Sequence, residues 1–209
     1  MNADVSRETF DRDQFASAFD VSRETLAHFD TYAAMLTDWQ SRMNLVGPAT
    51  LTQIWHRHFA DSAQLVALGK APWLDLGAGA GLPGLVIALL GAGPVDLVEA
   101  TTKKTDFLQA VVDATSLGDA TRIRRSRIED LPVQKPATIT ARACAPLVQL
   151  FEWGLRFASP TALWVLPKGA RVADEIVTAR TRFAFDYDLI PSLTDADARI
   201  VVACNVRRR

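Results

Sequence analysis

A glycine-rich segment constrains this chain more than any other feature of its sequence. It runs from Asp75 to Gly81, reads DLGAGAG, and follows a strand-like apolar run at Trp73–Leu76. Glycines allow the backbone to turn sharply and allow a ligand to approach it closely. A helix that begins directly after such a turn directs its free amide groups at the ligand. The segment therefore predicts a cofactor site, although a tight turn without a ligand would also use some of these residues.

Two acidic residues indicate which cofactor the turn binds. Glu99 ends the next strand-like run, where a carboxylate can accept hydrogen bonds from both ribose hydroxyls of an adenosine. Asp75 stands just before Gly77, where it would repel a pyrophosphate and attract the ammonium and sulfonium groups of S-adenosylmethionine. S-adenosylmethionine is therefore the favoured cofactor. Glycines 79, 81 and 84 also fit a dinucleotide pattern, so an NAD-dependent reductase stays an alternative.

Strand-like and helix-like runs alternate from Pro72 onward, which predicts an α/β fold with a mostly parallel sheet covered on both faces. The last two strands have no helix between them, so we expect an antiparallel hairpin at one edge of the sheet. The expected parallel strands are residues 73–76, 95–99, 121–124, 138–144 and 162–166, the helices are 85–90, 103–116, 147–157 and 172–183, and the closing strands are 185–190 and 199–205.

Residues 1–70 are predicted to form a helical extension, and residues 71–209 one compact domain. Ser22 is a suitable N-cap for a first helix that ends near Asn44, and Thr52 can cap a second. The N-terminus carries Asp4 and Glu8 and has no apolar core, so no secretory signal is expected.

Composition excludes several classes of protein. Hydrophobic residues make up 49% of the 209 residues and charged residues 22%, which is typical of a globular protein. The longest apolar run is too short to span a membrane, and the two cysteines without a secretion signal indicate a cytoplasmic protein. The histidines and cysteines form no plausible zinc set, so no metal is expected. The formal net charge of −1 means that any contact with RNA must come from a local patch.

Short segments from about residue 25 to the end of the chain match, in order, the pattern of a known family. The glycine segment closes with Pro83-Gly84, and the other segments are Asn44-Leu45, Arg57-His58 with Asp61-Ser62, Arg142-Ala143, and LPKG at residues 166–169. Together they resemble the RsmG (GidB) methyltransferases. The sequence departs from that pattern at Glu99-Ala100, at Val46 and at Pro167, where the family more often has Asp-Ser, Thr and no proline.

The resemblance implies a class I S-adenosylmethionine-dependent methyltransferase fold with an N-terminal helical extension. It implies transfer of the cofactor's methyl group to N7 of a guanine in 16S ribosomal RNA. We expect that RNA to be bound within a small ribosomal subunit or an assembly particle, and we expect the protein to be a monomer. The resemblance also implies cofactor contacts at several residues. With the loop and its acids, the predicted cofactor set is Asp75, Gly77, Gly79, Leu82, Glu99, Ile128, Glu129 and Arg142.

Guanine N7 carries a lone pair and needs no deprotonation before attack, so no general base is expected and the enzyme mainly aligns the reactants. Arg142 is the candidate catalytic residue because small neighbours leave its guanidinium room to reach the ligand. The alternative is a purely structural pair with a nearby carboxylate such as Glu129. The residues assigned to RNA are Arg57, His58 and Lys168.

Other interpretations stay open at this stage. Arg57 and Asp61 could form a surface ion pair beside a packed His58. The basic run from Arg122 to Arg127 is either an RNA patch or a solvated edge. A methyltransferase that acts on a small molecule or a protein, and an adenosyl-binding module without catalysis, also fit the residues.

Overall fold

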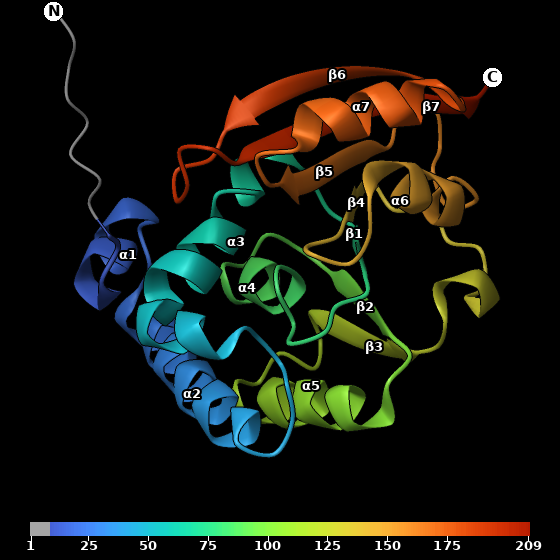
Figure 1. Cartoon of the computed structure of the whole chain (residues 1–209). Coiled ribbons are helices and arrows are strands. Elements are labelled where there is room, and N and C mark those ends of the chain that lie inside the picture. Colours follow the sequence, from blue (N-terminus) through green and yellow to red (C-terminus); the bar gives the residue numbers. More distant parts are fainter. Residues whose placement is uncertain (1–8) are drawn as a thin grey trace, which may run out of the picture.

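The computed structural model describes residues 9–209, and its centre is a seven-stranded sheet in the order β3-β2-β1-β4-β5-β7-β6 (Figure 1). The first eight residues of the predicted extension, which include Asp4 and Glu8, lie outside this range. The parallel strands are β1 (Trp73–Leu76), β2 (Val95–Glu99), β3 (Thr121–Arg125), β4 (Thr138–Thr140) and β5 (Leu163–Lys168). The hairpin of β6 (Phe183–Pro191) and β7 (Arg199–Arg208) is antiparallel, as the sequence predicted.

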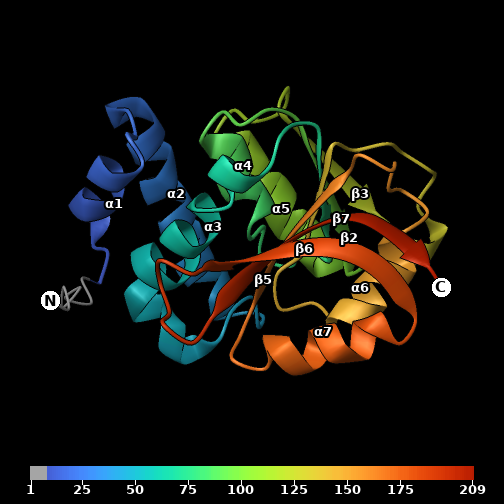
Figure 2. The same ribbon diagram turned by 90° about the horizontal axis from the view of Figure 1, so that it is seen from above.

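Helices cover both faces of the sheet (Figure 2). One face carries α4 (Gly84–Leu89) and α5 (Thr102–Ala114), and the other carries α6 (Leu147–Gly154) and α7 (Val172–Arg180). Successive side chains of a strand point to opposite faces, so Trp73 of β1 joins the first apolar core and Leu74 the second. Burial on both faces explains why the parallel strands are continuous apolar runs in the sequence.

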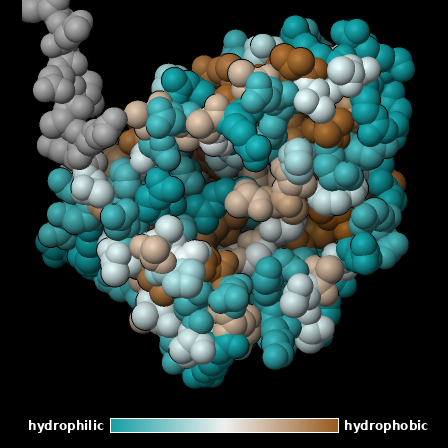
Figure 3. Space-filling model, in the orientation of Figure 1, coloured by the Kyte–Doolittle hydropathy of each residue, from teal (hydrophilic) through white to brown (hydrophobic). Residues whose placement is uncertain are grey.

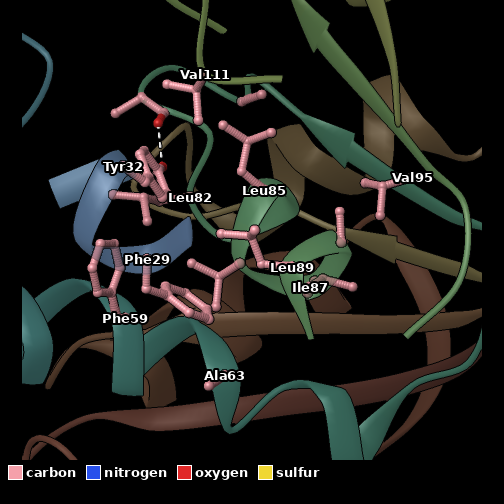
Figure 4. Packing of buried hydrophobic residues seen from close by; sticks show 14 of the residues in the cluster. Phe29, Tyr32, Phe59, Ala63, Leu82, Leu85, Ile87, Leu89, Val95 and Val111 are labelled. Atoms are coloured by element: carbon pink, nitrogen blue, oxygen red, sulfur yellow. Dashed lines mark hydrogen bonds between the residues drawn. The ribbon is translucent and has the colours of Figure 1, made fainter. Parts of the chain in front are cut away.

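The helical extension packs onto the α4–α5 face. Its helices are α1 (Arg12–Ala18) and α2 (Arg23–Gln40), and the Oγ of Ser22 accepts a hydrogen bond from the backbone N–H of Thr25, as expected of an N-cap. Tyr32, Phe29 and Phe59 of the extension lie in one apolar core with Leu82 and Leu85 of the sheet domain (Figure 4). The extension therefore shares its core with the domain that follows it.

The second expected helix is not a regular α-helix, and this expectation was wrong. The stretch from Pro48 to Leu68 consists of a 3-10 turn at Pro48–Gln53, a π-helical turn at Trp55–Ala60, a single α-turn at Asp61–Ala63 and a second 3-10 turn at Val66–Leu68. Apolar spacing reports which side of a segment is buried but not whether its turns are α, 3-10 or π. π-Turns are found frequently at functional sites, because they change the direction in which side chains leave a helix.

The fourth strand is shorter than predicted. It ends at Thr140 rather than Cys144, and Ala143 in the predicted stretch has a positive φ of 51°, outside the β region of the backbone. Arg142 therefore lies in the loop after β4 and not within the strand.

The molecular surface is mostly hydrophilic on the face seen in Figure 3, with more hydrophobic residues visible in a hollow at its middle. No helix in residues 9–209 is both long enough and apolar enough to cross a bilayer. Within the same range, His, Cys, Asp and Glu side chains form no group of three or more that could hold a metal ion.

Candidate active site

A wide cleft of about 1230 Å³ opens where the parallel strands end. Its walls come from the loops after β1, β2, β3, β4 and β5, together with residues of the helical extension and of the β6–β7 loop. The sheet order reverses between β1 and β4, and open α/β sheets bind ligands in the crevice at such a point. The predicted site residues that line this cleft are Gly77, Gly79, Leu82, Glu99, Ile128, Glu129, Arg142, Arg57, His58 and Lys168.

The glycine-rich loop has the backbone that its sequence predicts. Gly77 and Gly79 have φ values of 70° and 56°, which side chains other than glycine rarely adopt. A Cβ placed on Gly79 would meet only the carbonyl oxygen of Gly77, at 3.7 Å, so the space beside Gly79 is open to the cleft. A Cβ on Gly77 would instead lie 2.4 Å from the Sγ of Cys144. The loop can therefore accept a ligand against its backbone at Gly79.

Glu99 holds the loop and also faces the cleft. Its Oε2 accepts a hydrogen bond of 3.1 Å from the N–H of Gly79, and its Oε1 accepts one of 2.8 Å from the N–H of Thr101. Each carboxylate oxygen has further lone pairs, so both can still accept a ribose hydroxyl. The residues fit the adenosine part of S-adenosylmethionine. A pyrophosphate fits poorly, because the N–H of Gly79 that it would need already donates to the carboxylate of Glu99.

Asp75 lies beneath the loop, fully buried, and it does not line the cleft. Its Oδ2 accepts a hydrogen bond of 2.9 Å from the N–H of Gly84 at the start of α4, and its Oδ1 has no hydrogen-bond partner in residues 9–209. Burial raises the pKa of Asp75 to about 7. The carboxyl group therefore anchors the helix that follows the loop. Glu99, rather than Asp75, is the carboxylate that would repel a pyrophosphate in the cleft. A direct contact between Asp75 and the cofactor stays a prediction.

Arg142 is held by the helical extension rather than by Glu129. Its Nη1 donates to the Oδ2 of Asp61 and to the carbonyl oxygen of Arg57, both at 3.1 Å, and its Nη2 lies 3.2 Å from the Nδ1 of His58. The predicted alternative of a pair with a nearby carboxylate is confirmed, but the carboxylate is Asp61 rather than the suggested Glu129. A guanidinium has five N–H donors, so some remain for a ligand in the cleft.

His58 is buried and neutral, and its neighbours set its tautomer. Burial, with the nearby charge of Arg142, lowers the pKa of His58 to about 3. Because Arg142 can only donate, the Nδ1 of His58 accepts, and its Nε2–H donates to the Oγ1 of Thr50 at 2.8 Å. The Thr50 hydroxyl in turn donates to the carbonyl oxygen of Gly47 at 2.6 Å. This chain of hydrogen bonds fixes the His58 ring against Arg142.

The predicted pair between Arg57 and Asp61 does not form. Arg57 pairs with Asp195 of the β6–β7 loop, with 3.2 Å between Nη1 and Oδ2. Asp61 is instead shared between Arg142 and the same loop, because its Oδ1 accepts a hydrogen bond of 2.9 Å from the hydroxyl of Thr194. The π-turn explains the difference, since it breaks the regular spacing that would stack residues 57 and 61.

Lys168 lines the cleft, but its ammonium group is already paired. The side chain is 7% exposed, and its Nζ lies 2.9 Å from the Oε2 of Glu175 and 2.8 Å from the carbonyl oxygen of Ala145. Glu175 also accepts a hydrogen bond from the backbone N–H of Leu147 at 2.7 Å. Lys168 therefore ties α6, α7 and the loop after β4 together, which leaves it poorly placed to contact RNA.

Part of the basic run in and after β3 is structural. Arg124 pairs with Asp96 at 3.3 Å, and Arg125 pairs with Asp106 at 2.7 Å. Arg127 lines the cleft with its Nε 3.9 Å from Glu129. Arg127 is the one basic residue of the run that lines the cleft, so it alone suits an RNA patch, whereas Arg124 and Arg125 suit a solvated edge.

Lys104, which the sequence offers as a possible extension of the basic run, lines the cleft and forms no ion pair in the described part of the chain. Several other cleft residues were missed by sequence reasoning, among them Arg171, which forms no ion pair there either. Thr194 and Asp195 reach the site from the far end of the chain. A pairing between segments so distant in sequence leaves no local pattern to detect, whereas Arg171 could have been found from its place just after the LPKG segment.

Comparison with known proteins identifies the family. A model described as rRNA small subunit methyltransferase G, GidB, matches residues 25–200. The chain belongs to the GidB family. The ribosomal RNA small subunit methyltransferase G of Methylobacterium nodulans is 45% identical to this GidB chain over 200 residues, which cover 91% of this chain and 93% of that protein. The resemblance seen in the short sequence segments is thereby confirmed.

Solved structures agree on the fold of this GidB protein. Fibrillarin from Aeropyrum pernix, solved with bound S-adenosyl-L-methionine, has a TM-score of 0.51 and 15% identity, and the match covers 65% of this chain and 66% of that one. The glycopeptide N-methyltransferase MtfA, also solved with S-adenosylmethionine, has a TM-score of 0.58 and 12% identity over 70% of this chain and 93% of that one. The fold is that of class I S-adenosylmethionine-dependent methyltransferases. The GidB membership rules out the NAD-dependent reductase.

Proposed function

We propose that the protein transfers the methyl group of S-adenosylmethionine to N7 of a guanine in 16S ribosomal RNA. The observation that carries this proposal is a single cleft with two different walls. One wall is the glycine loop with Glu99, which suits an adenosine, and the other is the group of Arg142, His58 and Asp61 from the loop after β4 and the extension. GidB relatives named as ribosomal RNA small subunit methyltransferases support the choice of RNA as substrate.

The cofactor would lie along the glycine loop. Gly79 offers backbone at the open side of the loop, and Gly77 lines the cleft beside it. Glu99 offers acceptors for ribose hydroxyls, and Ile128 with Glu129 borders the same part of the cleft. When bound there, S-adenosylmethionine supplies an electrophilic methyl group next to the rest of the cleft. The chain's own task is to align the acceptor base with that group and to exclude water.

The site chemistry fits attack by a group that already has a lone pair. His58 is neutral and turns its Nδ1 toward Arg142, and Asp75 is buried below the loop. Neither presents a base to the cleft. Guanine N7 needs none, and a guanidinium that has donors to spare suits the electron-rich edge of guanine, where N7 and O6 accept hydrogen bonds. We therefore propose that Arg142 binds the guanine base of the substrate and aligns it for methyl transfer.

The size and charge of the cleft support an RNA substrate. A single small-ligand pocket measures about 300–1000 Å³, so a cleft of about 1230 Å³ has room for a cofactor and a nucleotide. Lys104 and Arg171 on its rim form no ion pair within residues 9–209, and Arg127 has only the exposed, long contact with Glu129 at 3.9 Å. We assign these three cations to phosphates of the RNA. A local patch of this kind suits a chain whose formal net charge is −1.

Calorimetry of the purified protein with S-adenosylhomocysteine and with NADH shows which kind of cofactor the protein binds. We expect binding of S-adenosylhomocysteine and none of NADH. Binding of NADH without binding of the homocysteine compound would overturn the proposal. We further infer that the protein acts as a monomer in the cytoplasm, on 16S rRNA in a small ribosomal subunit or an assembly particle. Light scattering tests whether it is a monomer, and co-sedimentation tests whether it binds the small subunit.

A further inference from the structure

Tyr32 of α2 reaches from the helical extension into the glycine loop. Its hydroxyl donates a hydrogen bond of 2.5 Å to the carbonyl oxygen of Ala80 (Figure 4). The side chain is fully buried, and burial raises the pKa of Tyr32 well above its ordinary value, so the hydroxyl stays a donor. The carbonyl of Ala80 therefore has a permanent partner from a different part of the chain.

The loop needs such a partner because its own residues allow more than one backbone conformation. Ala80 is followed by Gly81, which has a φ of 85°, and a peptide unit next to glycine can rotate with little steric cost. The N–H of Gly79 is held by Glu99, and the N–H of Gly84 by Asp75. These two bonds fix donors on either side of the Ala80–Gly81 peptide. The N–H of that peptide donates to the carbonyl oxygen of Ala78 at 2.7 Å, and the bond from Tyr32 holds its carbonyl.

Aromatic packing determines where the Tyr32 hydroxyl points. The ring centroid lies 5.2 Å from that of Phe59 and 6.4 Å from that of Phe107, and Leu82 lies beside it in the same core (Figure 4). A ring enclosed on these sides cannot swing away from the loop without opening the core. The position of α2 on the sheet domain thus sets the position of the Ala80 carbonyl.

The same helix also supports another part of the cleft wall. Gln40, the last residue of α2, accepts hydrogen bonds from the N–H groups of Leu45 and Val46 at 2.9 and 3.0 Å and donates one to the carbonyl of Val46. Both residues line the cleft. One helix therefore positions the glycine loop at its middle and a second cleft-lining loop at its end.

We propose that Tyr32 is a positioning residue for the cofactor, and that the helical extension is part of the cofactor site rather than a separate appendage for the substrate. The inference rests on the proposed binding of S-adenosylmethionine at the glycine loop. Loss of the Tyr32 hydroxyl leaves the Ala80 carbonyl without its donor, so this peptide keeps only the bond from its N–H to Ala78 and is held less firmly. Cofactor affinity then falls while the residues that face the RNA are unchanged.

The test compares Tyr32→Phe with Thr115→Val. Thr115 is a matched control, since its buried hydroxyl also donates to a backbone carbonyl, that of Val111 at 2.7 Å, at the end of α5 and away from the cleft. We expect similar losses of melting temperature in the two variants. We expect the Kd for S-adenosylhomocysteine to rise about fivefold or more in Tyr32→Phe and to stay at the parental value in Thr115→Val.

Kinetics separate positioning from simple destabilisation. In Tyr32→Phe the KM for S-adenosylmethionine should rise, while kcat at saturating cofactor and the affinity for RNA without cofactor match those of Thr115→Val. Equal cofactor affinity in the two variants would overturn the role of Tyr32 even though the parent binds cofactor. A parent protein that binds no S-adenosylhomocysteine would instead overturn the proposed function itself.

Discussion

The Nη1 of Arg142 lies 3.1 Å from the Oδ2 of Asp61, and this pair joins the loop after β4 to the helical extension. Both side chains are mostly buried, at 15% and 20% exposed. Removing one partner of a buried pair leaves the other uncompensated, which destabilises more than loss of a surface ion pair. The pair therefore gives Arg142 a structural role beside the one proposed for it in catalysis.

Arg142→Ala should lower both stability and activity. The variant leaves Asp61 and the Nδ1 of His58 without their donor, so we expect a loss of about 1–3 kcal/mol in the free energy of unfolding. Methyl transfer should fall at least about tenfold, which one lost contact of about 1.4 kcal/mol in the transition state would produce. Denaturant unfolding and steady-state kinetics measure the two effects.

A double-mutant cycle with Asp61→Asn is the control for that pair. If the two residues interact as the structure indicates, the stability losses of Arg142→Ala and Asp61→Asn combine to less than their sum. The Asp61→Asn variant keeps Arg142 in the cleft and should retain more activity than Arg142→Ala. Additive losses in stability, together with parental activity in Arg142→Ala, would contradict this account.

His58 should make the protein less stable at mildly acid pH. Its pKa is about 3 in the folded protein against 6.5 ordinarily, so below pH 6.5 the unfolded chain takes up a proton that the folded chain refuses. The contribution of neutral His58 to the free energy of unfolding is fully present above pH 6.5, and it is lost as the pH falls below that value. His58→Asn keeps an acceptor for Arg142 but does not titrate, so the decline from pH 6.5 to 4 should be weaker by up to about 3 kcal/mol. Denaturant midpoints measured across this range would contradict the assignment if both proteins declined equally.

Asp75 should act in the opposite direction. Its pKa is raised from 3.8 to about 7, so between these values the folded chain holds a proton that the unfolded chain releases, and stability is lost as the pH rises toward 7. Asp75→Asn keeps an oxygen for the N–H of Gly84 and carries no charge. The stability of the variant relative to the parent should increase from pH 4 to pH 7, by up to about 4 kcal/mol, and stay level above. A relative stability that does not change with pH would show that the carboxyl group is ionised throughout.

Arg171 and Lys168 should differ in their effects on RNA binding. Arg171→Ala should weaken binding of 16S rRNA and reduce the slope of log affinity against log salt by about 0.7–0.9, the value for one phosphate contact. Lys168→Met should lower stability, because it breaks the ties to Glu175 and Ala145, and leave that slope unchanged. Arg180→Ala, at the far end of α7, is the matched control for lost charge. The same slope in Arg171→Ala and Arg180→Ala would remove Arg171 from the RNA surface.

Local features of the sequence predicted most of the fold. The glycine loop, the acid that ends β2 and the alternation of strands and helices are set by backbone and burial rules that act over a few residues, and each has the predicted place in the structure. The helix after Ser22 was also predictable, because its cap lies within the segment.

Features that depend on distant partners could not be predicted. The sequence places Arg142 near the cleft but does not reveal that Asp61 holds it, since no periodicity relates a loop after β4 to a π-turn in the extension. Lys168 and Asp75 illustrate the same limit. Whether a charged side chain faces a ligand or the interior depends on neighbours such as Glu175 and Gly84, and only packing of the whole chain brings those together.

The activity proposed for this protein is methyl transfer to guanine N7 in 16S rRNA. The most direct measurement is mass spectrometry of nucleosides from 16S rRNA of cells with and without the gene, complemented with the parent or with Arg142→Ala. We predict that N7-methylguanosine falls when the gene is absent, returns with the parent and returns poorly with the variant, while other modified nucleosides stay constant. An unchanged level of N7-methylguanosine without the gene would contradict the account.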